Sequence, residues 1–275
     1  MPQEDVDLDL DSLWYIQKNP KFPPPTITSL GVTSSAITHR ARRESSQQKV
    51  FRHYIVAMVR WIVDLSVSQF DLRWDSNHPR SSLQVIRTHY PPPRPLSDAA
   101  LAAAGDKYGW RLVRWAKTQL GQQVGDGSSL AFAREGLLAI NKANRLTRAH
   151  EPVFVTEGRV HGYCFGEHIM PTGTWIKPGM QPKAGDIIEF KDAAFVTKVR
   201  DGTGKALVQK TVERKEHTAI FLTSLGTTVR VLQQGAEGRN QVEKGDYDFV
   251  EMVQGKMVFY RPVGRTWAPP LEARH

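Results

Sequence analysis

The spacing of apolar residues changes at Pro152, and this change limits the folds open to the chain. Before Pro152, three segments carry apolar residues every three or four positions, which is typical of helices that bury one face: residues 97–104, 111–121 and 130–143. After it come short runs rich in β-branched and aromatic residues, separated by Gly, Asp-Gly and Pro-Gly. Helices followed by closely spaced strands predict an α+β domain with an antiparallel sheet, because parallel βαβ units would alternate the two.

The composition is that of a globular protein in a reducing compartment. Hydrophobic residues make up 40% and charged residues 24% of the chain, which excludes a wholly disordered protein. The single cysteine, Cys164, cannot form an internal disulfide, and we expect it to be a buried, inert thiol. The acidic first residues do not resemble a leader, and no apolar run reaches the roughly 20 residues of a membrane span. We therefore expect a cytoplasmic protein without a transmembrane segment.

The net charge of +9 favours an anionic partner, such as nucleic acid, anionic lipid or an acidic protein. The densest basic cluster lies between residues 40 and 60. Its candidate residues for binding an anionic partner are Arg40, Arg42, Arg43, Lys49 and Arg52. A solvated, flexible segment that leads into a helix explains the same cluster without any partner. Both interpretations stay open.

The chain before residue 97 divides into three predicted segments. Residues 1–49 are expected to be a disordered arm, first acidic and then basic, because PKFPPP cannot continue a helix and no apolar periodicity follows it. Residues 50–72 show a wide apolar arc at 100° per residue and predict a long amphipathic helix, which could dock on the next domain, form a homodimer or lie at a membrane interface. Residues 73–96, with PPPRP, predict a proline-rich linker, a composition that also suits an SH3-type groove. The rest is predicted to be one α+β domain at 97–265 and a tail at 266–275.

The stretch VGDGSS, at residues 124–129, leads directly into the third predicted helix. A glycine-rich turn that ends at a helix N-terminus is used in cysteine hydrolases, because the helix end lowers the pKa of the thiol. Here the turn ends in Ser128 and Ser129. A helix end activates a hydroxyl much less than a thiol, so a serine nucleophile would need a strong general base. Ordinary N-capping also explains both serines. The candidate base is His217, which opens an apolar strand. Gln234 could orient the imidazole by accepting a hydrogen bond from its ring N–H.

Four motifs in order then resemble a known family: VGDGSSLAFAREGL, GYCFG, KAGDIIEF and EHTAIF, followed by a closing YRPV. Over residues 107–262 they resemble the cysteine-proteinase-fold domain at the C-terminus of fungal myosin tail region-interacting proteins, which is similar to the papain-like NlpC and CHAP amidases. The resemblance implies a papain-like fold and actin and myosin-I partners in a fungal cytoplasm. It places the catalytic cysteine of the family at Ser129, the histidine at His217 and the asparagine near Gly235. Two of three catalytic positions thus differ, which puts the activity in doubt.

Three functions remain open from the sequence. The first is a papain-like domain that is not an enzyme and acts as a protein-interaction module of the actin cytoskeleton. The second is a hydrolase or acyltransferase that uses Ser129 and His217, with backbone N–H groups of the turn stabilising an oxyanion. The third is a nucleic-acid-binding or anionic-surface-binding protein that uses the basic cluster. The sequence has no P-loop, dinucleotide-binding, zinc-protease or EF-hand motif, so we expect neither a cofactor nor a metal.

Overall fold

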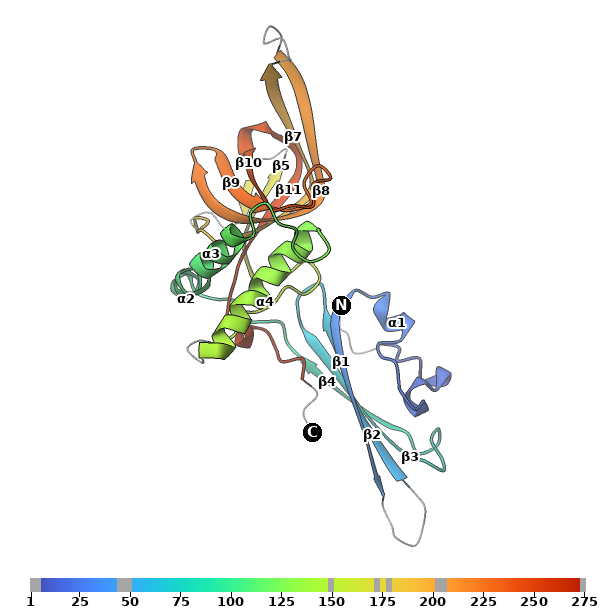
Figure 1. Cartoon of the computed structure of the whole chain (residues 1–275). Coiled ribbons are helices and arrows are strands. Elements are labelled where there is room, and N and C mark those ends of the chain that lie inside the picture. Colours follow the sequence, from blue (N-terminus) through green and yellow to red (C-terminus); the bar gives the residue numbers. More distant parts are fainter. Residues whose placement is uncertain are drawn as a thin grey trace. The chain divides into compact units, whose positions relative to one another are not determined.

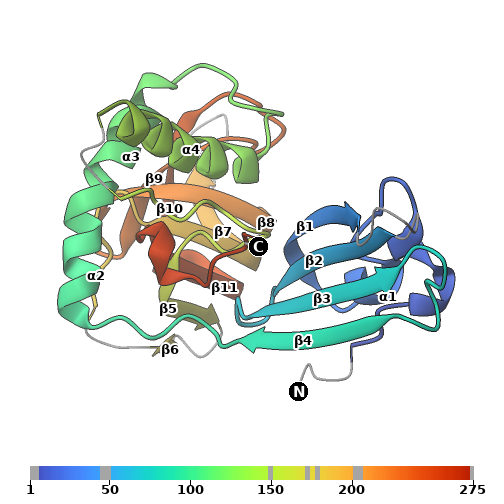
Figure 2. The ribbon, with the colours of Figure 1, turned by 90° about the horizontal axis from the view of Figure 1, so that it is seen from below.

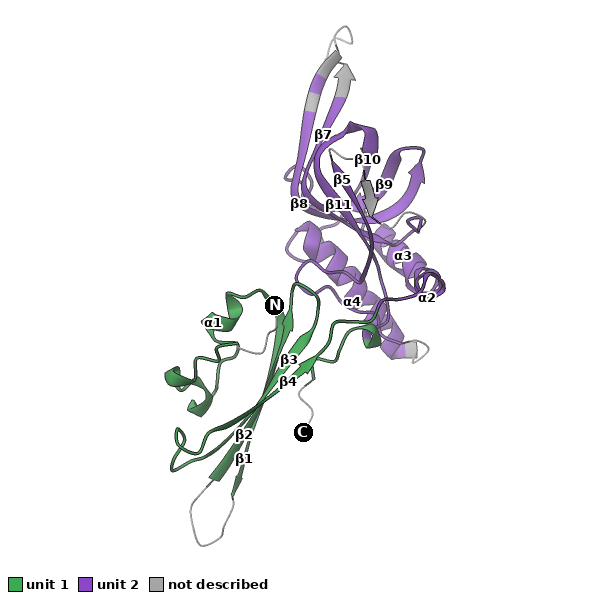
Figure 3. Ribbon diagram, turned by 180° about the vertical axis from the view of Figure 1, so that it is seen from behind, with its two compact units in different colours: residues 1–94, 266–275 green, residues 95–265 purple. Residues whose placement is uncertain are grey.

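Figure 1 shows the computed structural model, which describes residues 6–43, 51–147, 151–170, 174–176, 180–200 and 207–272. The chain divides into two compact units (Figure 3). The first consists of Met1–Arg94 with Thr266–His275, and the second of Pro95–Arg265. The second unit contains the whole range of the predicted α+β domain, 97–265.

The described part of the first unit is built on a four-stranded antiparallel sheet (Figure 2). Its strands follow one another in space as they do in the chain: β1 Val32–Arg43, β2 Phe51–Trp61, β3 Val67–Asp75 and β4 Gln84–Tyr90. One face of the sheet buries Ala57, Phe70 and Leu72. The N-terminal segment covers this face with short 3₁₀ turns at Leu10–Ser12 and Trp14–Ile16 and the helix α1, Pro25–Thr28, and its buried side chains are Val6, Leu8, Trp14, Tyr15 and Ile27.

The predicted amphipathic helix at 50–72 is wrong, because the segment forms β2 and most of β3. β2 is buried from Ile55 to Trp61 without a break, so both of its faces are covered there. A strand buried on both faces has a near-continuous apolar run, which the helical arc at 100° per residue fits equally well. A homodimer through that helix therefore loses its basis.

The predicted disordered arm and linker are also wrong in their described parts. The arm, 1–49, contains α1 and β1, which pairs with β2 from Val32 to Arg43. The proline-rich stretch was expected to be a linker over 73–96, yet β4 lies within it and pairs with β3. Prolines stop helices and central strands, but here they follow the edge strand β4, a position that tolerates them.

Among the described residues of the second unit, helices precede a seven-stranded antiparallel sheet, which confirms the α+β class. The helices are α2 Asp98–Ala104, the π-helical turn Gly105–Gly109, α3 Trp110–Thr118 and α4 Ser129–Thr147. The strand order is β10-β9-β8-β7-β11-β5-β6. The strand bounds are β5 Tyr163–Met170, β6 Thr174–Ile176, β7 Ile187–Arg200, β8 Leu207–Leu225, β9 Thr228–Gln233, β10 Glu243–Asp248 and β11 Met252–Arg261.

The core of the second unit lies between its helices and one face of the sheet (Figure 1). Leu112 of α3 and Phe132 of α4 are fully buried there against Ile187 and Ile220 of the central strands. Cys164 of β5 is exposed, contrary to expectation, because side chains alternate along the strand and its neighbours take the buried side. In the described part of the chain, no helix has the length and apolarity needed to cross a bilayer.

Candidate functional site

The glycine turn before α4 determines where its two serines point. Gly125 and Gly127 have φ angles of +58° and +87°, a left-handed backbone that glycine adopts without a side-chain clash. Ser128 caps the helix, since its Oγ accepts a hydrogen bond from the Ala131 N–H at 3.1 Å. The capping predicted for this turn therefore belongs to Ser128, and the hydroxyl of Ser129 is left for another contact.

The hydroxyl of Ser129 binds the backbone of β8. Its Oγ accepts a hydrogen bond from the N–H of Thr218 at 3.1 Å, one residue after His217. The ladder between β8 and β9 stops where Ala219 pairs with Gln233, so the hydroxyl supplies the next acceptor along this edge of β8. Ser129 is 8% exposed. Within the described residues, no hydrogen bond joins Ser129 to the imidazole of His217.

The imidazole of His217 is held by a different residue from the one predicted. Its Nε2 lies 3.0 Å from Oε1 of Gln233, and the ring packs 5.8 Å from the ring of Phe190. An amide oxygen only accepts, so Nε2 of His217 is the donor of this hydrogen bond. Burial lowers the pKa of His217 to about 4, against the opposing effect of the Gln233 hydrogen bond. The side chain is 4% exposed.

The prediction that Gln234 orients the imidazole is wrong. Its Oε1 accepts from the N–H of Val124 at 2.7 Å, and its Nε2 donates to the carbonyls of Val124 at 2.8 Å and Ser128 at 3.1 Å. Gln234 therefore holds the glycine turn against the sheet. Gln233 is the last residue of β9 and pairs with the second residue after His217, so Gln233 and His217 lie on the same face of the sheet.

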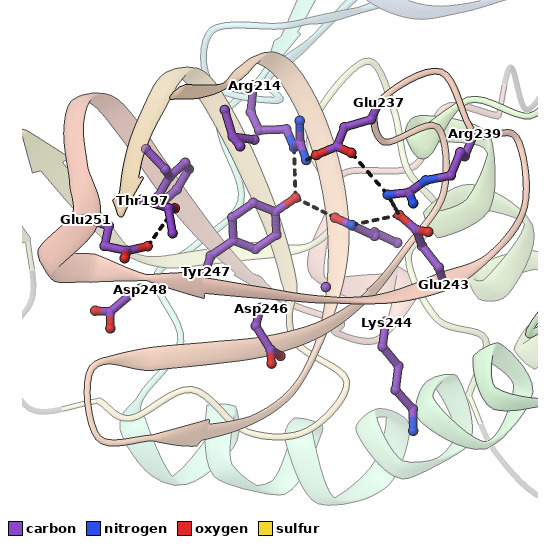
Figure 4. A pocket seen from close by; sticks show the side chains of 14 residues that line it. Thr197, Arg214, Glu237, Arg239, Glu243, Lys244, Asp246, Tyr247, Asp248 and Glu251 are labelled. Atoms are coloured by element: carbon purple, nitrogen blue, oxygen red, sulfur yellow. Dashed lines mark hydrogen bonds and ion pairs between the residues drawn. The ribbon is translucent and has the colours of Figure 1, made fainter. Parts of the chain in front are cut away.

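A network of polar side chains continues from Gln233 to the surface (Figure 4). The hydroxyl of Tyr247 donates to Oε1 of Gln233 at 2.6 Å, and Nε of Arg214 donates to Tyr247 at 2.8 Å. On the other side, Nε2 of Gln233 lies 3.4 Å from Glu243, which pairs with Arg239 at 3.0 Å. These residues line a hollow of about 200 Å³. Since they meet only through the pairing of β8, β9 and β10, no local pattern in the sequence indicated them.

A second hollow, of about 570 Å³, opens beside His217. It is lined by residues 211–217 of β8 together with Gly235 and Glu237. Gly235 has a φ of +75°, and a Cβ there would lie 3.1 Å from the carbonyl oxygen of Gly127 and 3.3 Å from the N–H nitrogen of Ser129. The close approach of this loop to the glycine turn leaves no side chain at the position where the resemblance implied an asparagine.

Comparison with known proteins identifies the family. Residues 86–272 match the AIM3/BBC1 cysteine proteinase-fold domain. The chain belongs to the AIM3/BBC1 cysteine proteinase-fold family. It is 22% identical over 272 residues to Altered inheritance of mitochondria protein 3 of Debaryomyces hansenii, covering 95% of this chain and 27% of that protein. It is 25% identical over 194 residues to the SH3 domain-containing protein C23A1.17 of Schizosaccharomyces pombe, covering 69% of this chain and 11% of that protein.

The chain thus spans 27% or less of the length of these two curated relatives. No solved structure matches it. The family match confirms the resemblance drawn from the four motifs and the cysteine proteinase fold that it implied.

The AIM3/BBC1 domain also contains a buried polar cluster that sequence reasoning missed. The carboxylate of Glu189 accepts hydrogen bonds from Oγ1 of Thr218 at 2.6 Å and from Nε2 of His161 at 3.2 Å, and it is ion-paired with Arg159. Burial raises the pKa of Glu189, but its hydrogen bonds and the charge of Arg159 outweigh this and lower it overall. Thr218 therefore contacts two groups. Its N–H donates to Oγ of Ser129, and its hydroxyl donates to the ionised carboxylate of Glu189.

The basic residues predicted to bind an anionic partner lie before the AIM3/BBC1 match, which begins at residue 86. Arg40, Arg42 and Arg43 are exposed at the end of β1, and Arg52 is half-buried on β2. Lys49 lies outside the described residues. The strand register puts Arg42 directly opposite Arg52, with Arg40 on the same face, whereas Arg43 points to the other face.

Proposed function

We propose that this chain is a catalytically inactive cysteine-proteinase-fold domain that acts as a protein-interaction module. The observation that carries the proposal is the hydrogen bond from the Thr218 N–H to Oγ of Ser129. A serine nucleophile needs a general base within about 2.6–3.2 Å of its hydroxyl, to take up the proton. In the part of the chain that the structure describes, no hydrogen bond joins Ser129 to the imidazole of His217, and a pKa of about 4 makes this imidazole a weak base at neutral pH.

In this proposal, Ser129 stands where the family has its catalytic cysteine. The glycine turn, the helix N-terminus and a histidine one residue from the bound amide support that assignment. A hydroxyl gains little from the helix end, because its pKa lies far above that of a thiol. Gly235 has no side chain that could orient an imidazole. The former catalytic centre therefore has a structural role, in which Ser129 connects α4 to β8 by a hydrogen bond.

The proposed partners are proteins of the fungal actin and myosin cytoskeleton, encountered in the cytoplasm. The likeness to fungal myosin tail region-interacting proteins supports this. One relative is by name an SH3 domain-containing protein, and SH3 domains bind extended proline-rich segments.

Turnover assays test the loss of catalysis. The full chain is incubated with fluorogenic peptide, ester and isopeptide substrates, beside His217→Ala and Ser129→Ala. We expect the same background rate from all three proteins, since no proton transfer links the hydroxyl to the imidazole. Ser128→Ala serves as a matched control, because it removes the neighbouring hydroxyl. Turnover that depends on both His217 and Ser129 but not on Ser128 would contradict the proposal and favour a hydrolase or acyltransferase.

A further inference from the structure

A group of arginines lies on one face of the sheet β1–β4, at the end where β1 and β3 finish and β2 begins. The register aligns two rows of side chains across the strands there. The outer row is Arg42, Arg52 and Asp75, and the next is Arg40, Tyr54, Arg73 and Gln84. We call the arginines of these rows, Arg40, Arg42, Arg52 and Arg73, the arginine face. The N-terminal segment packs on the opposite side of the sheet, with Ala57 and Phe70.

The charge on the arginine face is poorly balanced by the rest of the described chain. Its rows contain one carboxylate, Asp75, which lies 3.5 Å from Nε of Arg52. Among the described residues, Arg40, Arg42 and Arg73 have no ion-pair partner. Like charges directly opposite each other destabilise a sheet, and Arg42 stands directly opposite Arg52. An anionic partner would remove this repulsion.

The arginine face is also hollowed. Arg52, Tyr54, Arg73 and Gln84 line a depression of about 230 Å³ together with Ser82. The guanidinium of Arg73 lies over the ring of Tyr54, 5.9 Å from its centroid, which holds the group beside the depression. All the described cations of the two rows are guanidinium groups, which bind carboxylates through two parallel hydrogen bonds.

We propose that the arginine face binds an extended acidic segment of a partner protein. Side chains i and i+2 of an extended peptide point the same way and lie about 6.6–6.8 Å apart. The two rows have the same separation, because Arg40 and Arg42 are themselves residues i and i+2 of a strand. One carboxylate meets Arg42 and Arg52, and the next meets Arg40 and Arg73 from either side of Tyr54. A single phosphate would reach only one row.

The choice of a protein as partner rests on the proposed function, but the site lies in the first unit. If the arginine face binds no acidic peptide, the assignment of Ser129 still stands, because the turnover assays concern residues of the second unit only. If the turnover assays show catalysis, the binding measurements below still test the arginine face.

Fluorescence anisotropy with the full chain tests this proposal. The probe is a labelled peptide, Glu-Thr-Glu-Thr-Glu-Thr, and the variants are Arg42→Glu and Arg73→Glu. Each reversal should weaken binding by about tenfold or more, because it replaces a charged hydrogen bond by a repulsion. Arg87→Glu makes the same charge change on the opposite face, where Arg87 pairs with Phe70, and should bind like the original chain. Thermal unfolding confirms that the variants fold.

Two further peptides and three other anionic ligands test which ligand the arginine face prefers. The isomer Glu-Glu-Thr-Thr-Thr-Glu should bind more weakly than the alternating peptide, since no two of its glutamates are residues i and i+2. The glutamine analogue should not bind. Equal affinity of the two isomers, or equal loss in Arg87→Glu, would overturn the proposal. So would binding only to oligo(dT), to phosphatidylserine–phosphatidylcholine vesicles or to inorganic phosphate, with no binding of the peptide.

Discussion

At the scale of single residues, the two adjacent glutamines Gln233 and Gln234 have separate tasks. Gln233 binds the imidazole of His217, and Gln234 makes three hydrogen bonds to the backbone of the glycine turn. Both are buried, at 4% and 0% exposure. Gln233 ends β9 on the face of the sheet that carries the histidine, whereas Gln234 follows the strand and reaches the turn that carries Ser129.

The substitution Gln234→Ala tests the second of these tasks. It would leave the N–H of Val124 buried without a hydrogen-bond partner, which costs about 1–3 kcal/mol, whereas the carbonyl of Val124 keeps the N–H of Gly127. We expect the free energy of unfolding to fall by about 2 kcal/mol in urea denaturation. Gln254→Ala, at an exposed position of β11, should change it by less than about 0.5 kcal/mol. A loss of that small size for Gln234→Ala would show that the turn does not depend on it.

At the scale of elements, the strands and helices that bury one face could be predicted from the sequence. Helices α3 and α4 and strand β9 show the spacing expected for a half-buried helix or strand. Strand β2 does not, because its residues from Ile55 to Trp61 are covered on both faces. Periodicity cannot assign such a segment, and the turn between β2 and β3, at residues 62–66, has no glycine or proline to mark it as two strands.

The candidate site was predictable only as far as element order determines it. Ser129 and His217 could be placed in one site because the order of the four motifs resembles that of the family. The expectation that His217 opens a strand is wrong, since it lies within β8. The choice between Gln233 and Gln234 depends on the register of β9 against β8, which the sequence does not contain. Glu189 was missed for a similar reason, since its partners come from separate runs of the chain.

A histidine pair links β1 and β2 and makes that end of the sheet sensitive to pH. Nε2 of His39 lies 3.1 Å from Nδ1 of His53, and both rings stack with Trp74. Partial burial lowers the pKa of each histidine below 6.5, and the charge of His39 lowers that of His53 further. Below pH 6.5 the unfolded chain therefore binds protons that the folded sheet does not, and stability falls as the pH falls.

Replacing one histidine checks this pair. In His39→Gln, NMR titration should place the pKa of His53 closer to 6.5, because the charge beside it is gone. The first unit should then lose less stability between pH 7 and pH 5, which hydrogen exchange of β2 amides measures. An unchanged His53 pKa in this variant would show that the two rings do not influence each other.

At the scale of the whole molecule, the family fold and the arginine face belong to different units. The AIM3/BBC1 match begins at residue 86. Of the first unit it therefore includes only most of β4, the residues that follow it and part of the tail. The Debaryomyces hansenii relative aligns over 95% of the chain, and so over much of both units.

The central claim is that Ser129 is a hydrogen-bond acceptor for β8 and not a nucleophile. Mass spectrometry of the full chain after incubation with a fluorophosphonate, which labels activated serines, tests it most directly. We expect no adduct on Ser129, because its hydroxyl is buried and bound to the Thr218 amide, and because a pKa of about 4 makes His217 a weak base. An adduct on Ser129 that disappears in His217→Ala would contradict this claim.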